Sequence, residues 1–477
     1  MNDLRKSLGL PALVALGAAG VLGTSWIYTN GQFFAKYGAG GEIFGLALGA
    51  LLAAFIALSY AELASKFPRA GGELIFGYLA FNRTVGFLAG WLLIGAYISS
   101  IAFYVTAAGM LLSDVFPSLT AIPLYSIAGA TVYLPVLLVG VALAAVICAI
   151  NAYGMRLGGG TQLVFFGIII AIGVALAIVG FTAGSPSNFW PPYAPDGAPL
   201  PQTLRFVLPA MTFLTGFSLV AILAEDANMN PRRIGTAVVV TVVVAGTFYC
   251  VVLLASAWII PWEKTATLKQ GTIDAYRIAG FPMLSWGAYA ISLLGLLTSF
   301  LALFVATSRI MLALARAGLF PRAFARVSGR RGTPVNALAL TLILALLFGL
   351  LGEGALIWFL DTGGVYIGLA WFIGVVSMYR IRRRYPQVES PYRARLSWLP
   401  AVGGVAALLV ILATLAPGTD MSLVWPSEYA ILLAWVILGV VIYGLAPKDD
   451  ENQALKTLLG DQYDKLERDK EDDPTRP

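Results

Sequence analysis

Long apolar runs recur along the whole chain, and they constrain its fold more than any other feature. The 477 residues contain twelve such runs, each bounded by proline, glycine or charge. A helix needs roughly 20 apolar residues to cross the hydrocarbon core of a bilayer. The pattern therefore predicts an all-α integral membrane protein with twelve transmembrane helices that contact the lipid bilayer. The predicted spans are 10–36, 42–66, 85–116, 132–151, 158–183, 204–226, 234–260, 284–315, 334–351, 356–380, 398–416 and 427–446.

The composition excludes several functions. The chain has no histidine, so no imidazole is present to bind a metal or to transfer a proton. Cys148 and Cys250 each lie inside an apolar run, where a thiol behaves as a small hydrophobic group. We therefore expect no enzyme, no cofactor other than a coupling sodium ion or proton, and no nucleic-acid partner. The sequence does not define an oligomeric state.

The distribution of lysine and arginine predicts the topology. With the N-terminus inside, 26 of the 31 basic residues fall in cytoplasmic segments, as expected for a multi-pass protein of the plasma (inner) membrane. Both termini are then cytoplasmic. We expect the first run to remain in the mature protein, because it is too long and glycine-rich for a signal peptide.

Two segments lie outside the predicted spans. Residues 447–477, with ten acids and six bases, form a cytoplasmic tail that we expect to be a solvated helix or disordered. Residues 184–203, with six prolines, form an external connector. The transporter domain is then 1–446.

Two spans carry residues that weaken a helix at mid-depth. The first contains Gly17, Gly20 and Gly23, followed by Thr24 and Ser25. The sixth contains a similar group of hydroxyls around a glycine, at 212–218. Interrupted helices at matching positions of two halves indicate a transporter's binding site near the middle of the bilayer. The alternative is that these glycines are ordinary packing contacts between helices.

A broken helix exposes amide NH groups on one side of the gap and carbonyl groups on the other. The NH groups suit a carboxylate, and the carbonyls suit an ammonium group or a cation. A zwitterion satisfies both. The substrate-binding residues we expect are Gly20, Gly23, Thr24, Ser25, Trp26, Tyr97, Ser100, Thr212, Phe213, Thr215, Gly216, Phe217 and Ser218.

These segments resemble the amino acid-polyamine-organocation (APC) superfamily. The run 23–28 (GTSWIY) is similar to its first-span signature, and 223–228 (LAEDAN) with 230–233 (NPRR) to the end of its sixth span. The resemblance covers residues 10 to 445. Further matching segments are 60–63 (YAEL), 68–73 (PRAGGE), 89–91 (AGW), 151–156, 308–321 and 332–336 (GTPVN).

The resemblance implies a fold and a function. The fold is the LeuT-type five-plus-five inverted repeat, with repeats at about 10–183 and 204–380, helices one and six broken, and two extra helices at about 398–446. Members of the superfamily move amino acids, polyamines or related amines by proton or sodium symport or by exchange. The resemblance therefore predicts a secondary active transporter, a permease for a small molecule, working by alternating access.

Three positions depart from the family pattern. Ser25 replaces the third glycine of the first-span motif, and Ser218 replaces an acid found after Gly-Phe in many members. Ile169 falls where several proton-coupled members have a lysine. The two best-known proton-carrying groups of the family are thus missing.

Asp361 is an ionisable residue within the tenth span, where a charge is costly without a partner. We interpret it as a gate, an ammonium site or a proton site. The alternative is a helix N-cap at the membrane surface.

Thr298 and Ser299 form a hydroxyl pair in the eighth span. With carbonyls near Gly20 they could bind sodium, which prefers oxygen ligands. Alternatively, both hydroxyls bond back to the preceding helical turn. We slightly favour protons over sodium as the coupling ion, because protons are the commoner choice in the family.

Other polar and aromatic groups have two readings. Tyr97, Ser100 and Tyr104 share one helical face that either lines the site or only packs. Trp26, Phe213 and Phe217 are candidate gates. The charged groups at the cytoplasmic span ends either close the inner gate or are solvated; they are Glu62, Glu73, Glu225, Asp226 and Arg233.

Alternatives to a symporter remain at this level. A substrate exchanger differs only in whether the empty carrier can reorient, which no motif reports. A receptor or scaffold would not need two matched helix breaks. The substrate's side chain is also undefined by sequence.

Overall fold

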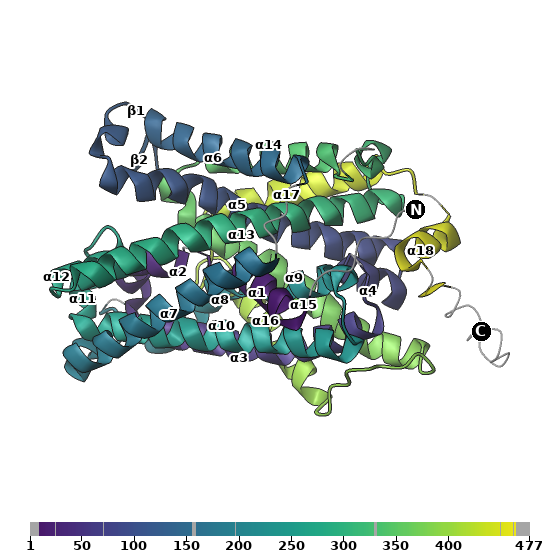
Figure 1. The fold of residues 1–477 in the computed structure, drawn as a ribbon, viewed down its shortest axis with the longest axis horizontal. Helices are drawn as coiled ribbons and strands as arrows, with labels where there is room; N and C mark the ends of the chain where they lie inside the picture. The colour runs from purple at the N-terminus through teal and green to yellow at the C-terminus, as the bar shows by residue number, and fades with distance from the viewer. Residues whose placement is uncertain are drawn as a thin grey trace.

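The computed structural model describes residues 9–23, 25–69, 71–154, 159–195, 197–328, 332–448, 450–460 and 462–463. Helices dominate this part of the chain, and they run along the long axis of the molecule (Figure 1). The α-helices are α1 (Leu10–Val21), α2 (Ser25–Tyr28), α3 (Asn30–Lys66), α4 (Glu73–Ala80), α5 (Arg83–Val115), α6 (Leu134–Ala152), α7 (Gly159–Ala183), α8 (Pro199–Phe213), α9 (Gly216–Ile222), α10 (Pro231–Ile259), α11 (Trp262–Thr265), α12 (Gly271–Ile278), α13 (Pro282–Arg316), α14 (Val335–Gly349), α15 (Leu356–Arg384), α16 (Trp398–Leu415), α17 (Ser427–Gly444) and α18 (Glu451–Leu459).

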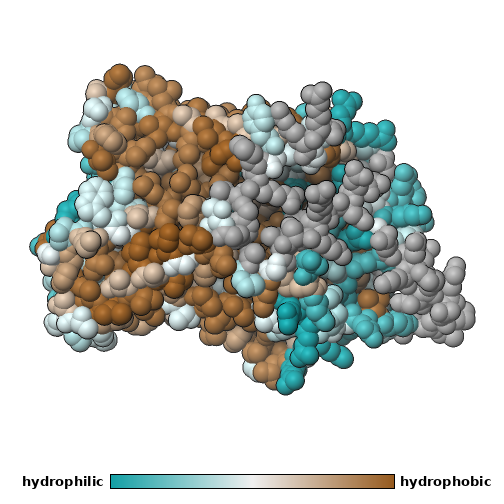
Figure 2. Space-filling model, in the orientation of Figure 1, coloured by the Kyte–Doolittle hydropathy of each residue, from teal (hydrophilic) through white to brown (hydrophobic). Residues whose placement is uncertain are grey.

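Within the described residues, ten helical segments are long and apolar enough to cross a membrane, and α14 is a shorter apolar helix. The outer helices expose large apolar side chains such as Leu138, Val164, Leu409 and Val440. In water this exposure would be unfavourable. Figure 2 shows the apolar band along the body, with hydrophilic residues gathered at one end. The chain is thus a multi-pass membrane protein.

The two ends of the molecule differ in structure. One end, here called the hairpin end, carries α11, α12 and an antiparallel hairpin of β1 (Pro123–Ile127) and β2 (Ala130–Tyr133). The opposite end, here called the tail end, carries α4 and α18 (Figure 1). The hairpin was not anticipated from the sequence, because its strands are short and lie between two apolar spans.

The boundary between the first two predicted spans is a kink rather than a loop. Helix α3 runs continuously from Asn30 to Lys66, and only Gly38 departs from helical geometry, with φ +69° and ψ 164°. A side chain at this φ is strained, and the connector fills the space beside Gly38 with Tyr193 and Ala194. The amide of Gly40 donates to the carbonyl of Pro192 at 2.5 Å. The proline-rich connector therefore packs against this kink.

The core is built around α3, α5, α8, α10 and α15. Helix α3 packs against α8 and α10, and α5 packs against α15. The short helices α1 and α9 lie among these long helices at mid-length, and α2 lies nearer the hairpin end, where it contacts α12 (Figure 1). The peripheral helices α6, α7, α16 and α17 are mostly exposed on one side. Both helix breaks are thereby surrounded by protein, as backbone at membrane depth requires.

Part of the tail is neither solvated nor without structure. Helix α18 begins with Asp450 accepting hydrogen bonds from the amides of Asn452 and Gln453. It buries Ala454, Leu458 and Leu459. The expectation of a solvated helix is therefore wrong for this face of α18. The rest of the tail beyond Tyr463 lies outside the described residues.

Candidate substrate site at two helix breaks

The predicted breaks are present in both spans. Helix α1 ends at Val21, and α2 begins at Ser25. Helix α8 ends at Phe213, and α9 begins at Gly216. Thr24 lies outside the described residues, as does the side chain of Ser25. Glycine, threonine and serine tolerate or favour non-helical backbone, which explains why both helices end here.

The two breaks are in direct contact. A methyl group added to Gly20 would lie 3.3 Å from the Cα of Gly216, and one added to Gly216 would collide with the carbonyl of Gly17 and with Val21. Only glycine allows the backbones of α1 and α9 to approach this closely. Packing and helix breaking are thus two roles of the same glycines, and the two readings of the sequence do not exclude each other.

A cavity of about 250 Å³ lies between the breaks. None of its lining residues carries a charge, and its polar groups come from Ser100, Tyr104 and Thr212. Gly20, Ser100, Tyr104, Thr212 and Phe213 were anticipated from the sequence. The lining consists of Gly20, Val21, Ser100, Phe103, Tyr104, Thr212, Phe213 and Leu360.

The lining residues that the sequence did not single out are apolar. Val21 ends α1, and Phe103 lies beside Tyr104. Leu360 precedes Asp361 in α15. Nothing distinguishes such residues from ordinary core side chains, except their position next to a predicted site residue.

Several predicted site residues lie behind the cavity lining. The indole of Trp26 packs against Phe248 and Tyr249 of α10, with ring centroids 5.6 and 4.8 Å away. The Thr215 hydroxyl donates to the carbonyl of Thr212. Gly23 faces the hydroxyl of Tyr104. These groups support the break rather than the cavity wall.

Phe217 and Ser218 point toward α3 and α15. The Phe217 ring lies 5.4 Å from Tyr60 and 4.8 Å from Trp371 between centroids. The indole of Trp371 donates to the hydroxyl of Ser218 at 3.0 Å. Tyr97 is fully buried one helical turn before Ser100. These residues form a layer on the tail side of the cavity.

Helix α13, which carries the proposed sodium ligands Thr298 and Ser299, packs against the two half-helices of the first break. Gly295 of α13 packs against the carbonyls of Leu22 and Gly23, at 2.5 and 3.0 Å from an added methyl group. The Thr298 hydroxyl donates to the carbonyls of Leu294 and Gly295 in its own helix. This is the helical back-bonding that was the alternative reading of Thr298. Ile169 is a buried apolar residue of α7.

Asp361 is fully buried and paired. Its Oδ2 accepts a hydrogen bond from Arg205 of α8 at 2.6 Å, and the same guanidinium nitrogen lies 3.4 Å from Oε2 of Glu428 in α17. Helix α15 begins five residues earlier, at Leu356. The N-cap reading of Asp361 is therefore wrong. We call Arg205, Asp361 and Glu428 the outer charge cluster, after the side of the membrane on which the distribution of basic residues predicts it.

Ion pairs also connect elements at the tail end. Glu62 of α3 accepts two hydrogen bonds from Arg382 of α15, at 2.6 and 2.5 Å. Arg69 and Glu225 lie 3.8 Å apart and are partly exposed. These contacts support the gate reading of the charged span ends. The side chain of Asp226 lies outside the described residues.

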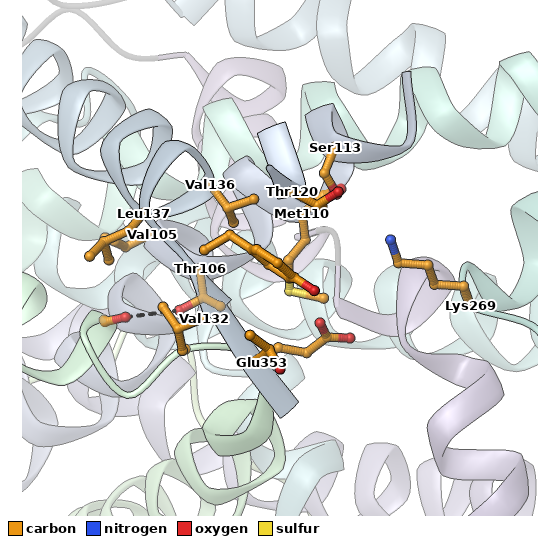
Figure 3. A pocket seen from close by; sticks show the side chains of 14 residues that line it. Val105, Thr106, Met110, Ser113, Thr120, Val132, Val136, Leu137, Lys269 and Glu353 are labelled. Atoms are coloured by element: carbon orange, nitrogen blue, oxygen red, sulfur yellow. Dashed lines mark hydrogen bonds between the residues drawn. The ribbon is translucent and has the colours of Figure 1, made fainter. Parts of the chain in front are cut away.

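A larger cavity, of about 490 Å³, lies away from both breaks. Figure 3 shows Lys269 and Glu353 near its rim and Thr106, Met110 and Val132 in its wall. It opens beside the β-hairpin and includes no residue of α1, α2, α8 or α9. The smaller cavity is therefore the candidate substrate site.

The described residues contain no group of three or more Cys, Asp or Glu side chains arranged to hold a metal ion. Two broken helices around a small uncharged cavity, inside a bundle of membrane-spanning helices, are features of a membrane transporter. The model of the amino acid permease family matches residues 8–442. The chain belongs to this family, part of the APC superfamily, whose members are transporters and not enzymes.

Characterised relatives agree with this membership. The chain is 26% identical to the branched-chain amino acid permease BcaP of Lactococcus lactis, over 90% of this chain and 92% of the relative. It is 27% identical to a methylthioribose transporter of Bacillus subtilis, over 93% and 94% of the two chains. It is 26% identical to the lysine-specific permease LysP of Escherichia coli, over 80% and 79%. The function as an amino acid transporter follows from the family.

Proposed function

We propose that the chain imports a neutral amino acid with an apolar side chain, together with a proton, across the plasma membrane. The observation that carries the substrate class is the absence of charge among the eight residues that line the cavity between the helix breaks. A buried charged side chain needs a partner of opposite charge. An amino acid whose side chain is uncharged needs none.

The main chain of the substrate has partners of both signs in this arrangement. Carbonyl groups at the end of α1 can accept hydrogen bonds from the ammonium group of the substrate. Amide groups at the start of the half-helix that follows a break can donate hydrogen bonds to its carboxylate. Ser100 and Thr212 add hydroxyls that can accept or donate. The apolar wall from Val21, Phe103, Phe213 and Leu360 suits an aliphatic substrate side chain.

A cationic substrate is the second candidate, because LysP is also a relative. The acid nearest along the chain to the cavity wall is Asp361, which follows the lining residue Leu360. Its carboxylate is already paired with Arg205 at 2.6 Å. No free carboxylate is therefore present among the lining residues to select lysine or arginine.

The topology follows from the basic residues. We place the tail end in the cytoplasm and the hairpin end outside, with twelve spans, of which the first and sixth are each made of two half-helices. Alternating access then consists of opening the outer charge cluster or the tail-end ion pairs around a fixed cavity. A symporter requires that the empty carrier reorients, whereas an exchanger does not.

The experiment uses the purified full chain in substrate-free proteoliposomes. Uptake of labelled leucine, valine, lysine and glutamate is measured with an inward proton gradient or an inward sodium gradient. We expect net uptake of leucine or valine with the proton gradient alone. Preferred uptake of lysine would overturn the proposed substrate class. Uptake only into vesicles preloaded with amino acid would indicate an exchanger. Stimulation by the sodium gradient alone would point to Thr298 and Ser299 as sodium ligands.

A further inference from the structure

Glu73 is a buried carboxyl group without a cation. It is the first residue of α4, and its side chain is fully buried. Neither of its carboxyl oxygens has a hydrogen-bond partner of normal geometry. A carboxylate in such a place is strongly disfavoured, so the side chain must carry a proton or lie close to groups that can share one.

The surroundings of Glu73 come from four helices, and among the described residues no other acid or base that titrates near neutral pH influences it. Glu73 faces the hydroxyls of Tyr60 of α3 and Ser218 of α9, and Tyr97 of α5 lies within its electrostatic range. Trp371 of α15 donates to Ser218. Tyrosine ionises only at about pH 10 in water.

Arg69, four residues before Glu73 in the chain, pairs with Glu225 at 3.8 Å, and two further arginines lie at the opposite end of α4. Arg380 packs over the ring of Phe81, and Arg384 donates to the carbonyl of Leu79. No lysine or arginine of the described residues is among the groups that influence Glu73. The pKa of Glu73 is raised from 4.5 to about 7, because the effect of burial exceeds the lowering by its own backbone amide and by the hydroxyls of Ser218 and Tyr60.

Glu73 and the substrate cavity are joined by the same short helix. Gly216 begins α9 at the break, and Ser218 lies two residues later beside Glu73. Gly72, which directly precedes Glu73 in the chain, packs against Ile222 at the end of α9. A movement of α9 that opens the cavity toward the tail end therefore changes the environment of Glu73.

We infer that Glu73 is the site that binds and releases the coupling proton, and that it takes the place of the acid that Ser218 replaces in the sixth span. This inference rests on the proposed function and names its coupling group. A proton from the outside binds a carboxyl oxygen of Glu73 while the tail end is closed. When α9 moves and water reaches the carboxyl, the proton leaves to the cytoplasm and the carboxylate is hydrated.

Glu42 provides a matched comparison. It too is fully buried, and neither of its oxygens has a hydrogen-bond partner. It lies in α3 four residues after the kink at Gly38, near the hairpin end, and it does not line the cavity. Glu42 and Glu73 are therefore alike in their burial and in their lack of a hydrogen-bond partner. Of the two, Glu73 contacts the broken sixth span.

The test uses wild type, Glu73→Gln and Glu42→Gln in proteoliposomes with labelled leucine. In wild type and Glu42→Gln we expect an inward proton gradient to drive accumulation. In Glu73→Gln that stimulation should be lost, while exchange of internal for external leucine remains. Exchange by wild type should fall roughly fivefold between about pH 7 and pH 8, following the protonated fraction of a group with a pKa of about 7, and exchange by Glu73→Gln should not.

Accumulation by Glu73→Gln under a proton gradient, or loss of coupling in Glu42→Gln alone, would overturn the inference. If wild type transports no amino acid, the proposed function fails instead. If wild type transports but ignores the proton gradient, only the coupling proposal fails. Infrared difference spectra keep the test independent of transport: a carboxylic acid band should titrate near pH 7 in wild type and be missing in Glu73→Gln. If this carboxylic acid band persists in Glu73→Gln, the assignment of the proton to Glu73 is contradicted.

Discussion

The buried acids at the two ends of the molecule are neutralised in different ways. In the outer charge cluster, Arg205 lies between Asp361 and Glu428, and all three side chains are at most 3% exposed. On the tail side of the cavity, Glu73 is equally buried but has no cation. An ion pair fixes charge and geometry, whereas a lone carboxyl must exchange a proton with water. The first arrangement suits a gate, and the second suits a proton carrier.

The largest expected effect comes from removing the cation of the outer charge cluster. Arg205→Leu leaves Asp361 and Glu428 buried without their guanidinium partner, and removing one partner of a buried pair costs about 3–5 kcal/mol. We expect a large loss of thermal stability in detergent. The double variant Arg205→Leu with Asp361→Leu should recover part of the loss. Unchanged stability of the single variant would contradict the view that the cluster is an ion pair.

A second prediction concerns the pH dependence of stability. The pKa of Glu73 in the folded protein, about 7, lies above its ordinary value of 4.5, so the folded state binds this proton more tightly than the unfolded state. Its contribution is complete below about pH 4.5, declines as the pH rises toward 7, and is lost above 7, amounting to about 3 kcal/mol.

The matched variant separates this group from all others. The glutamine of Glu73→Gln cannot ionise, so the unfolding free energy of this variant should lack the decline between about pH 4.5 and 7. The measurement is thermal unfolding across that pH range. Parallel pH profiles for wild type and variant would show that Glu73 shares its charge with a partner, as the outer acids do.

The third prediction concerns the paired acid of the tail end. Glu62→Gln weakens two hydrogen bonds from Arg382, which is 20% exposed. It also weakens one from the amide of Ala394. Hydrogen bonds to charged groups contribute about 1.5–3 kcal/mol each in favourable cases, and partial exposure reduces this. We expect a loss of about 1–2 kcal/mol in chemical denaturation, with proton coupling retained. Lost coupling would assign Glu62 a part in proton transfer.

The smallest expected effect belongs to the partly exposed pair of Arg69 and Glu225. These side chains are 17% and 20% exposed and lie 3.8 Å apart. Exposed pairs contribute about 0–1 kcal/mol. Glu225→Gln should therefore change stability by less than about 1 kcal/mol, and the change should shrink in high salt. A larger, salt-independent loss would place this pair with the buried ones.

The sequence was sufficient for features that depend on local chemistry. Apolar runs predict the membrane helices, and glycines with hydroxyls predict both breaks. Helical spacing places Ser100 and Tyr104 on one face of α5, which lines the cavity. Each of these inferences uses residues within a few turns of one another.

Features that depend on distant residues could not be obtained in this way. Asp361 stands out in its span, but its partner Arg205 is 156 residues away. Glu73 follows two glycines at a span end, where an acid normally faces water, and only the packing of four helices removes that water. Trp26 resembles a gate by position but turns toward α10, because Phe248 and Tyr249 offer it an aromatic surface. The contacts of Asp361, Glu73 and Trp26 therefore depend on residues that are distant in the sequence.

The packing of α1 has a consequence for the assembly of the protein during synthesis. Helix α1 contacts α7, α9, α10 and α13, all of which are translated later. Its glycine face at Gly17 and Gly20 meets Val220, Leu219 and Gly216, about two hundred residues downstream. Until the sixth span has entered the bilayer, this short and interrupted helix has no partner for its close-packed face. Helix α1 is therefore translated before its partners but is among the last helices to reach its final position, and chains released early would expose it to quality control.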